Sequence, residues 1–179
     1  MFKFQFTTTG CVDAKVLILL IILPSVAGAI LLSAFLEEGK FTDAPSFTIT
    51  DVDGATFRLS ECKGKIVVLE FMATWCRYCK AQVEELKKVH EQFRNPSIII
   101  VSISIDPSDI SNTLRDYRDE LGATWIFAQS YEVGLNYSVK VLPTTVIIDY
   151  KGRIRFRHEG VVEASELIFE ISQLLNEME

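Results

Sequence analysis

The sequence predicts an α/β domain with a mixed central sheet flanked by helices, preceded by one N-terminal membrane segment. Three observations support this prediction. The most apolar stretch of the chain is one uncharged run near the N-terminus. After that run, short apolar segments typical of strands alternate with segments of helical periodicity, and the chain closes with a hairpin and a helix. Alternating strands and helices are typical of a sheet covered on both faces.

Composition excludes several classes of protein. The 179 residues are 49% hydrophobic and 23% charged, with 24 acidic and 18 basic residues and a net charge of -6. An acidic chain without a cluster of Lys and Arg lacks the electrostatic footprint of a nucleic-acid binder. The apolar content excludes disorder, and the length suits one domain with a tail. Four unevenly spaced cysteines are too few for a disulfide-stapled miniprotein.

Residues 16–36 form a candidate membrane anchor. They are 21 residues without a charge, of which 17 are apolar. A helix of this length spans roughly 31 Å, close to the ~30 Å hydrocarbon core of a bilayer. Lys3 and Lys15 precede the segment, whereas Glu37, Glu38 and Asp43 follow it. The preference for basic residues on the cytoplasmic side therefore places the N-terminus in the cytoplasm and the rest of the chain outside.

A cleaved secretory signal is the alternative interpretation of this segment. Residues 16–23 are continuously apolar, Pro24 interrupts them, and Ala27-Gly28-Ala29 has the small-x-small form of a cleavage site. Cleavage there would leave the apolar residues 30–36 as a new N-terminus, which favours an uncleaved anchor. The predicted organisation is therefore a cytoplasmic N-terminus (1–15), a transmembrane anchor (16–36), a linker (37–43) and a domain (44–179). In both interpretations the domain is membrane-anchored or released outside the cytoplasm.

The domain opens with a predicted hairpin. Residues 47–51 and 56–59 flank Val52-Asp53-Gly54, a turn sequence of the Asp-Gly type. Residues 66–72 are a continuous apolar run typical of a central strand. From Cys76 to about Phe93, apolar residues recur at steps of three and four, which predicts an amphipathic helix beginning at the first cysteine.

The remaining elements follow the same alternation. The segment 109–121 is expected to be a helix capped by Ser108 or Asp109 and closed by Gly122. Near the C-terminus, 146–149 and 154–158 are expected to pair as strands around the turn Tyr150-Lys151-Gly152. The other expected elements are a strand at 98–105, a strand at 125–128, a helical turn at 131–137 and a closing helix at 164–178.

Cys76 and Cys79, in Trp75-Cys76-Arg77-Tyr78-Cys79, are the candidate catalytic residues. Two cysteines at this spacing in the first turn of a helix can close a small disulfide ring. The backbone N–H groups and the positive end of the helix dipole favour a thiolate at the first position. We therefore predict that Cys76 is the nucleophile and Cys79 the resolving thiol. A zinc site would need two further ligands, and Cys62, His90 and His158 do not form a second ligand pair, so no metal is expected.

Two segments carry a resemblance to the thioredoxin superfamily. Residues 70–80, Glu-Phe-Met-Ala-Thr-Trp-Cys-Arg-Tyr-Cys-Lys, resemble its active-site segment, and residues 141–149, Val-Leu-Pro-Thr-Thr-Val-Ile-Ile-Asp, resemble its cis-proline segment. The opening hairpin, Lys63-Gly64-Lys65 and Tyr150-Lys151-Gly152-Arg153-Ile154 are similar to the membrane-anchored, extracytoplasmic TlpA/ResA branch. The resemblance covers residue 44 to the C-terminus. It implies a thioredoxin-like fold, protein disulfides as substrates, a membrane partner as electron donor, and no cofactor.

The resemblance also implies roles for individual residues. Pro143 would be a cis-proline facing the cysteine pair, exposing the backbone of Leu142 to an extended substrate segment. Without the resemblance, Pro143 could be an ordinary trans turn proline. Glu70 would be a buried carboxylate that accepts the proton of the resolving cysteine, although a Glu in an apolar strand could also point to an edge or pair with a lysine. Trp75, Arg77 and Tyr78 would contact the substrate.

The chain also departs from the family pattern. Ser102 and Ser104 stand on the strand where thioredoxins commonly hold a lysine near the carboxylate, so the charge state of Glu70 is open. Gln82 replaces the acidic residue often found three positions after the second cysteine. Arg77 should stabilise the Cys76 thiolate, which makes a disulfide a stronger oxidant. A reductase is the favoured function, and a disulfide oxidase or isomerase is the alternative.

Two other activities share this fold. Ser102-Ile103-Ser104-Ile105-Asp106-Pro107 resembles a run in peroxiredoxins, and the chain around Asp106-Pro107 resembles copper carriers of the Sco kind. The Pro and Thr expected before a peroxidatic cysteine are absent from Phe71-Met72-Ala73, and the histidine that a copper carrier needs is absent at Leu142-Pro143. Both therefore rank below thiol-disulfide exchange. Cys62 is expected to be a buried structural thiol.

Overall fold

The computed structural model describes residues 41–178. The predicted cytoplasmic N-terminus (1–15), the predicted anchor (16–36) and the first four linker residues (37–40) lie outside the described residues. Within the described range, every helix is too short or too polar to cross a membrane.

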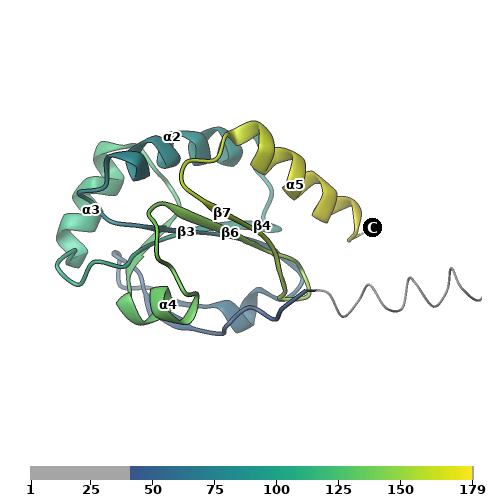
Figure 1. Cartoon of the computed structure of the whole chain (residues 1–179), viewed down its shortest axis with the longest axis horizontal. Helices are drawn as coiled ribbons and strands as arrows, with labels where there is room; N and C mark the ends of the chain where they lie inside the picture. Colours follow the sequence, from purple (N-terminus) through teal and green to yellow (C-terminus); the bar gives the residue numbers. More distant parts are fainter. Residues whose placement is uncertain (1–40, 179) are drawn as a thin grey trace, which may run out of the picture. The chain divides into compact units, whose positions relative to one another are not determined.

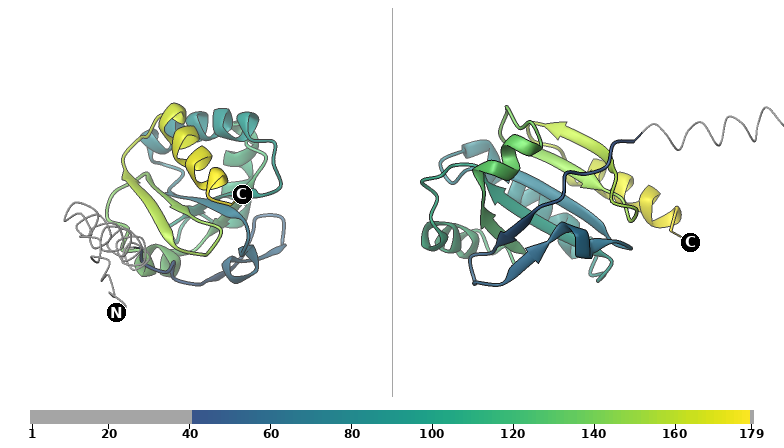
Figure 2. Two further views of the ribbon diagram at one scale, coloured as in Figure 1. Left: turned by 90° about the vertical axis from the view of Figure 1, so that its right-hand side faces the viewer. Right: turned by 90° about the horizontal axis from the view of Figure 1, so that it is seen from below.

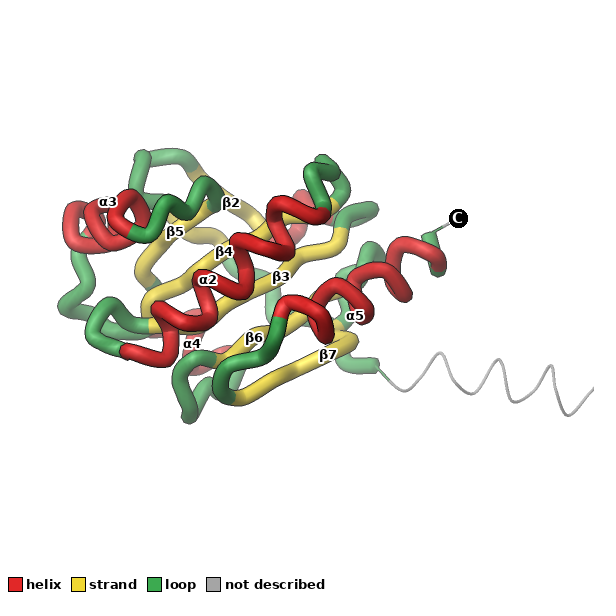
Figure 3. Tube along the Cα trace, turned by 90° about the horizontal axis from the view of Figure 1, so that it is seen from above, coloured by secondary structure: helices red, strands yellow, loops and turns green. Residues whose placement is uncertain are grey.

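A five-stranded mixed sheet forms the centre of the domain (Figure 1), in the order β5-β4-β3-β6-β7 (Figure 3). Strands β3, β4 and β5 are parallel, and β6 and β7 run antiparallel to their neighbours. The strands are β3 (Ile66–Met72), β4 (Ile98–Ser104), β5 (Ile126–Gln129), β6 (Thr144–Ile148) and β7 (Ile154–Glu159). The predicted α/β class and mixed sheet are therefore confirmed.

Helices cover both faces of this sheet. Helices α2 (Arg77–Gln92), α3 (Ser111–Glu120) and α5 (Ala164–Asn176) share one core with the side chains of one sheet face. The short helix α4 (Tyr131–Asn136), the 3₁₀ turn η1 (Leu59–Cys62) and the strands β1 (Thr48–Thr50) and β2 (Thr56–Arg58) cover the other face. Figure 1 and the left view of Figure 2 show the sheet between these two layers, and Figure 3 shows α2 and α5 in front of the sheet.

The central strand β3 shows why a continuous apolar run marks this position. All seven of its residues are buried, because helices cover one face and the hairpin layer covers the other. The side chains of its even-numbered residues point to the layer of α2, α3 and α5, and those of its odd-numbered residues point to the layer of the hairpin. Glu70 is the one charged residue in the strand, and it too is fully buried.

The predicted hairpin is confirmed. Strands β1 and β2 are antiparallel, with Ile49 opposite Phe57. A carboxylate oxygen of Asp51 accepts hydrogen bonds from the backbone N–H groups of Asp53 (2.9 Å) and Ala55 (2.8 Å), which closes the turn. Gly54 has a φ of +86°, a conformation that glycine adopts without steric cost.

Residues 42–44, at the predicted boundary between linker and domain, are hydrogen-bonded to the turn before β7. The N–H of Ile154 donates to the carbonyl of Thr42 at 2.8 Å, and the N–H of Ala44 donates to the carbonyl of Gly152 at 2.9 Å. Phe41 contacts the same region, with the guanidinium carbon of Arg155 4.2 Å from the centre of its ring.

The predicted cap of α3 is wrong. The helix begins at Ser111, its N-cap is Ile110, and no side chain caps it. The Asp109 carboxylate instead accepts hydrogen bonds from Thr74 and Ser104, on the segments that follow β3 and end β4. Asp109 does not cap the helix because its buried carboxylate is already satisfied by three donors from these two segments.

Candidate active site

The Cys76–Cys79 pair lies where β3 passes into α2, and the two sulfurs form a disulfide. Cys76 is the N-cap of α2, and its sulfur also accepts the backbone N–H of Cys79 at 3.2 Å. Cys76 is 6% exposed and Cys79 is fully buried. A partner molecule can therefore reach the sulfur of Cys76 before that of Cys79, as the predicted nucleophile and resolving thiol require.

The surroundings of Cys76 favour negative charge on its sulfur. The N-terminus of a helix carries a partial positive charge, and the first N–H groups of α2 have no partner within the helix. Arg77 is exposed beside Cys76, with its guanidinium carbon 5.3 Å from the centre of the Tyr78 ring. This combination of dipole and cation stabilises a thiolate relative to a thiol.

Two aspartates hold the segment that precedes Cys76, and the sequence alone did not indicate either contact. Asp109 accepts the backbone N–H of Thr74 at 2.9 Å and its hydroxyl at 2.5 Å. Asp106 accepts the indole N–H of Trp75 at 2.6 Å. Hydrogen bonds from the hydroxyl and backbone N–H of Ser108, and then from Trp75, lower the pKa of Asp106. In the sequence, residues 102–107 indicated a similarity to peroxiredoxins and copper carriers, but they did not indicate the contact between Asp106 and Trp75.

An open hollow of about 690 Å³ lies beside Cys76. It is lined by residues of the cysteine segment, including Trp75 and Tyr78, and by Pro107 and Leu142 from two other loops. Trp75 is 70% exposed and Tyr78 is 58% exposed, so both rings present apolar surface to solvent. The hollow is large enough to receive a side chain of a protein bound at Cys76.

The peptide bond between Leu142 and Pro143 is cis, as the resemblance implied. Leu142 lines the same hollow as Cys76. The carbonyl of Pro143 accepts the N–H of Gly160 at 2.8 Å, and the hydroxyl of Thr144 donates to the carbonyl of Val141 at 2.7 Å. These bonds fix the backbone on both sides of Leu142.

Glu70 is buried and interacts with β4. The hydroxyl of Ser102 donates to Glu70 Oε2 at 2.5 Å, and Trp125 Nε1 donates to the Ser102 hydroxyl at 2.9 Å. Burial raises the pKa of Glu70 to about 8, and the Ser102 hydrogen bond only partly opposes this. No cation is among the groups that shift this pKa, so burial favours the protonated carboxyl group. Trp125 was not among the predicted site residues.

Glu70 and Cys79 belong to the same side of the sheet. Glu70 has the same side-chain direction as Val68 and Met72, which pack in one core with Cys79 and α2. A proton acceptor on this face is therefore in the layer that contains the resolving thiol.

Gln82 occupies the position where the TlpA/ResA branch often has an acid, and it is fully buried. Its side-chain oxygen accepts the N–H of Val162 at 2.8 Å, and its amide nitrogen donates to the carbonyl of Val162 at 3.3 Å. Both contacts use the backbone of the loop that follows β7. Gln82 thus connects this loop to α2, and its side-chain hydrogen bonds are made to the loop and not to the disulfide.

Other candidate groups lie away from the disulfide. Cys62 is a buried free thiol, as predicted, and burial raises its pKa. Among residues 41–178, one group offers three potential metal-ligand atoms, namely His158, Glu166 and Glu170, which lie within 4.8 Å of one another. These residues are on β7 and α5.

Comparisons with known proteins agree with this geometry. The chain matches the AhpC/TSA family over residues 42–157. It is 29% identical over 145 residues to the thiol-disulfide oxidoreductase ResA of Bacillus thuringiensis subsp. konkukian, covering 78% of this chain and 83% of that protein. It is 28% identical over 134 residues to the thioredoxin-like protein YneN of Bacillus subtilis, covering 74% and 77%. The crystal structure of a DsbF homologue from Corynebacterium diphtheriae has a TM-score of 0.68 at 25% identity, covering 76% and 89%.

The fold and the disulfide at the start of α2 define a thioredoxin-like thiol-disulfide oxidoreductase. The chain belongs to the AhpC/TSA family and, within the thioredoxin superfamily, to its ResA-like members.

Proposed function

We propose that this protein reduces disulfides of extracytoplasmic protein substrates through the Cys76–Cys79 couple. The observation that carries the proposal is the asymmetry of the pair. Cys76 lies at the edge of a hollow at a helix N-terminus, whereas Cys79 is fully buried behind it. Such an arrangement suits one thiol for attack on a substrate and the other for release of that substrate.

The reaction has two steps. The Cys76 thiolate attacks a substrate disulfide, so that a Cys76–substrate bond forms and the first substrate sulfur leaves as a thiolate. Glu70 releases its own proton to water, and Cys79 then loses its proton to the Glu70 carboxylate and attacks the sulfur of Cys76. The Cys76–Cys79 bond forms, the second substrate sulfur leaves, and both substrate thiolates take up protons from water. Two electrons pass from the cysteine pair to the substrate.

The substrate is held by the surface around the disulfide. An extended segment pairs with the backbone of Leu142, next to the cis peptide bond at Pro143, as a form of strand addition. Trp75 and Tyr78 contribute exposed aromatic surface, and Arg77 contributes a charge at the rim of the hollow. Substitution of Leu142 by proline would introduce a residue without an N–H and should weaken substrate binding without removing the disulfide.

Cysteine variants test the proposal. We expect Cys76→Ser to abolish reduction of a protein disulfide such as that of insulin, and Cys79→Ser to accumulate mixed disulfides between Cys76 and its substrate. Cys62→Ser is the matched control, because Cys62 is a free thiol that does not join the pair. Full activity of the Cys76→Ser variant would contradict the assignment of the nucleophile.

Electron flow in the opposite direction, from the substrate to the cysteine pair, is the second candidate function. Arg77 beside Cys76 stabilises the thiolate, and a more stable thiolate makes the disulfide more oxidising, which would favour a disulfide oxidase or isomerase. The reduction potential of the couple separates the two functions. A value near that of thioredoxin (~-270 mV) supports a reductant supplied with electrons by a membrane partner, whereas a value near ~-120 mV supports an oxidant.

Residues 16–36 would hold the domain at the outer face of the membrane. Extraction of the protein from membranes by detergent, together with its intact mass, tests this part of the proposal. An intact chain in the membrane fraction supports an anchor. A soluble form that begins after Ala29 supports a cleaved signal instead.

Peroxide reduction and copper transfer are tested directly. Consumption of hydrogen peroxide by the reduced protein at a rate comparable with disulfide reduction would favour the peroxidase. Retention of copper through gel filtration would favour the copper carrier.

A further inference from the structure

A row of polar side chains crosses the sheet from the buried Glu70 to the surface. In the strand register, Ser102 is paired with Glu70, Glu70 with Thr145, and Thr145 with His158. Paired residues on neighbouring strands point to the same face of a sheet. These side chains therefore lie in one row, on the face covered by α2 and α5, and every neighbour in the row is polar.

Two atoms in this row are buried without a hydrogen-bond partner among the described residues. They are Glu70 Oε1 and the hydroxyl oxygen of Thr145. A buried polar atom without a hydrogen bond is unfavourable, so two of them on paired residues need an explanation. Unpartnered polar atoms on paired residues are also the kind of group that an internal water satisfies. A hydroxyl and a water between paired strands can pass a proton.

The free oxygen is the one that carries the proton of Glu70. Oε2 already accepts the hydroxyl of Ser102, which in turn accepts the indole N–H of Trp125. This chain of donors leaves Oε1 as the oxygen that can hold a proton and donate it. Oε1 belongs to the residue that is paired with Thr145 in the register.

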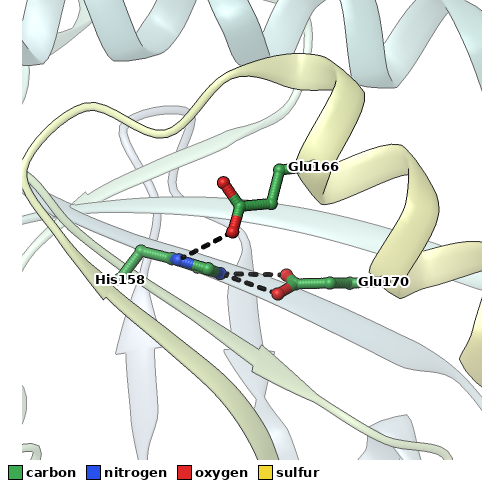
Figure 4. A group of neighbouring side chains, drawn as sticks. All are labelled: His158, Glu166 and Glu170. Atoms are coloured by element: carbon green, nitrogen blue, oxygen red, sulfur yellow. Dashed lines mark hydrogen bonds and ion pairs between the residues drawn. The ribbon is translucent and has the colours of Figure 1, made fainter.

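The other end of the row reaches solvent. His158 Nε2 lies 2.9 and 3.0 Å from the two carboxylate oxygens of Glu170, and its Nδ1 lies 4.0 Å from Glu166. The side chain of Glu170 is 9% exposed, that of His158 is 20% exposed and that of Glu166 is 58% exposed. Figure 4 shows the imidazole between the two carboxylates. Exposure thus increases stepwise from Glu70 to Glu166.

The same cluster is poorly arranged for a metal ion. The two carboxylates face opposite nitrogens of the ring, whereas one ion can use only the nitrogen that points to it. Opposite nitrogens are instead suited to a proton that arrives at one and leaves from the other. Histidine is the side chain that changes charge most readily near neutral pH.

We propose that Thr145 and the His158–Glu170 pair form the path by which Glu70 exchanges its proton with solvent during the resolving step. The inference rests on the proposed function, in which Glu70 takes the proton of Cys79. Before it can do so, Glu70 must release its own proton to water. The proton passes from Glu70 Oε1 through an internal water to the Thr145 hydroxyl, from there to the His158–Glu170 pair, and from His158 Nδ1 to solvent at Glu166. No other atom is exchanged and no electrons move.

A second possible proton path leads from Glu70 to solvent through α3, and the experiment must distinguish it from the first. Tyr117 of α3 has a buried hydroxyl without a partner, and the charge of Glu70 helps to raise its pKa after burial, the main cause. Lys80 of α2 lies 5.8 Å from the centre of this ring and pairs with Glu120, which is exposed. The titratable groups facing the row and this alternative branch are Lys80, Asp109, Tyr117, Glu120, Glu166 and Glu170.

The experiment follows the resolving step alone. The full chain, with Cys11→Ser and Cys62→Ser so that only the pair reacts, is reduced and mixed with excess Ellman's reagent. The reagent releases one coloured thiolate when Cys76 attacks and a second when Cys79 resolves the mixed disulfide. We expect Thr145→Val to slow the second release about tenfold at neutral pH, less than the ~10²-fold loss of a directly acting base. The first release should be unchanged. The defect should fade as pH rises above about 8, where Glu70 is already ionised.

Matched variants separate a proton path from a packing effect. Thr145→Ser keeps the hydroxyl and should restore the second release. His158→Ala should be slow in the same phase and should be accelerated by free imidazole, which a structural role would not explain. Because His158 is partly exposed, this variant decides the question if Thr145→Val does not fold. Tyr117→Phe should have no effect.

Two results would overturn the inference. One is a second release within twofold of the wild type in both Thr145→Val and His158→Ala. The other is a slow second release in Tyr117→Phe alone, which would assign the path to α3. Failure of the proposed function is distinguishable from both, because the wild-type protein would then show no second release.

Discussion

The carboxylate of Asp109 holds both the backbone N–H and the hydroxyl of Thr74, at 2.9 and 2.5 Å, across 35 residues of sequence. Thr74 is two residues before Cys76, so this contact fixes the backbone that delivers the predicted nucleophile. The same carboxylate accepts the Ser104 hydroxyl at 2.6 Å, at the end of β4. The cysteine segment is therefore attached to the neighbouring strand by one buried side chain.

Replacement of Asp109 by alanine should destabilise the fold. The change leaves three donors without their acceptor in a buried site, which costs on the order of 1–3 kcal/mol each before relaxation and entry of water. We expect a loss of about 2–3 kcal/mol in the free energy of unfolding, measured by denaturant titration of the oxidised protein. Asp116→Ala, on the exposed face of helix α3, which follows Asp109 in the chain, is the control and should have little effect. Equal stability of the two variants would refute the role of the buried contact.

Gln82 stands where the TlpA/ResA branch often has an acidic residue, and this difference leads to a prediction. Glutamate at this position could still accept the N–H of Val162, but an ionised carboxylate could not donate to its carbonyl. Gln82→Glu should therefore be less stable than wild type by about 1–3 kcal/mol at pH 8, because a charge and an unpaired carbonyl are both buried. The difference should shrink at pH 5, where the carboxyl can bind a proton and donate. The exposed neighbour Ala81→Glu serves as the control. A pH-independent difference would argue against this explanation.

The sequence was sufficient for elements whose pattern is local. Strand β3 was predicted with the observed bounds because a strand buried on both faces is apolar at every step. The start of α2 at the cysteine pair followed from helical periodicity and from the motif. The cap of α3 was predicted wrongly because Asp109 is a residue type common at N-caps and stands just before the helix, while its actual partners are Thr74 and Ser104.

Other parts of the site could not be predicted because they depend on strand register. Nothing in the local sequence of Thr145 or His158 indicates that they lie in one row with Glu70, since this follows only from the pairing of β3 with β6 and β6 with β7. The hydrogen bond from Trp125 to Ser102 likewise joins residues brought together by the parallel pairing of β4 and β5. The resemblance located the cysteines and the cis-proline but not these contacts.

Arg77 should raise the reduction potential of the disulfide. An exposed charge of this kind contributes up to about 1 kcal/mol to the stability of the neighbouring thiolate. Since 30 mV corresponds to about 1.4 kcal/mol for a two-electron couple, Arg77→Ala should lower the potential by about 20 mV or less. Equilibration with glutathione or a thioredoxin of known potential measures this shift. Arg94→Ala, after the far end of α2, should leave the potential unchanged, and a rise in potential in Arg77→Ala would contradict the proposed effect.

Glu70 should make the stability of the protein fall with rising pH. Burial raises the pKa of Glu70 from 4.5 to about 8 in the folded chain. The folded state therefore binds the proton more tightly than the unfolded state, and the resulting stability is complete below pH 4.5 and is lost as pH rises through about 8. Each pH unit within this window corresponds to about 1.4 kcal/mol. Glu70→Gln cannot ionise and lacks this slope.

We therefore expect Glu70→Gln to match the wild type near pH 5 and to exceed it by several kcal/mol near pH 8, since the amide oxygen can still accept the Ser102 hydroxyl. Denaturant titrations of both proteins across this range give the difference directly, and other titrating groups cancel because the two chains share them. Glu84→Gln, which alters an exposed carboxylate paired with Lys87, should run parallel to the wild type. Parallel curves for Glu70→Gln and wild type would mean that Glu70 is ionised when buried. Its proton could then not be the one that must leave before Cys79 reacts.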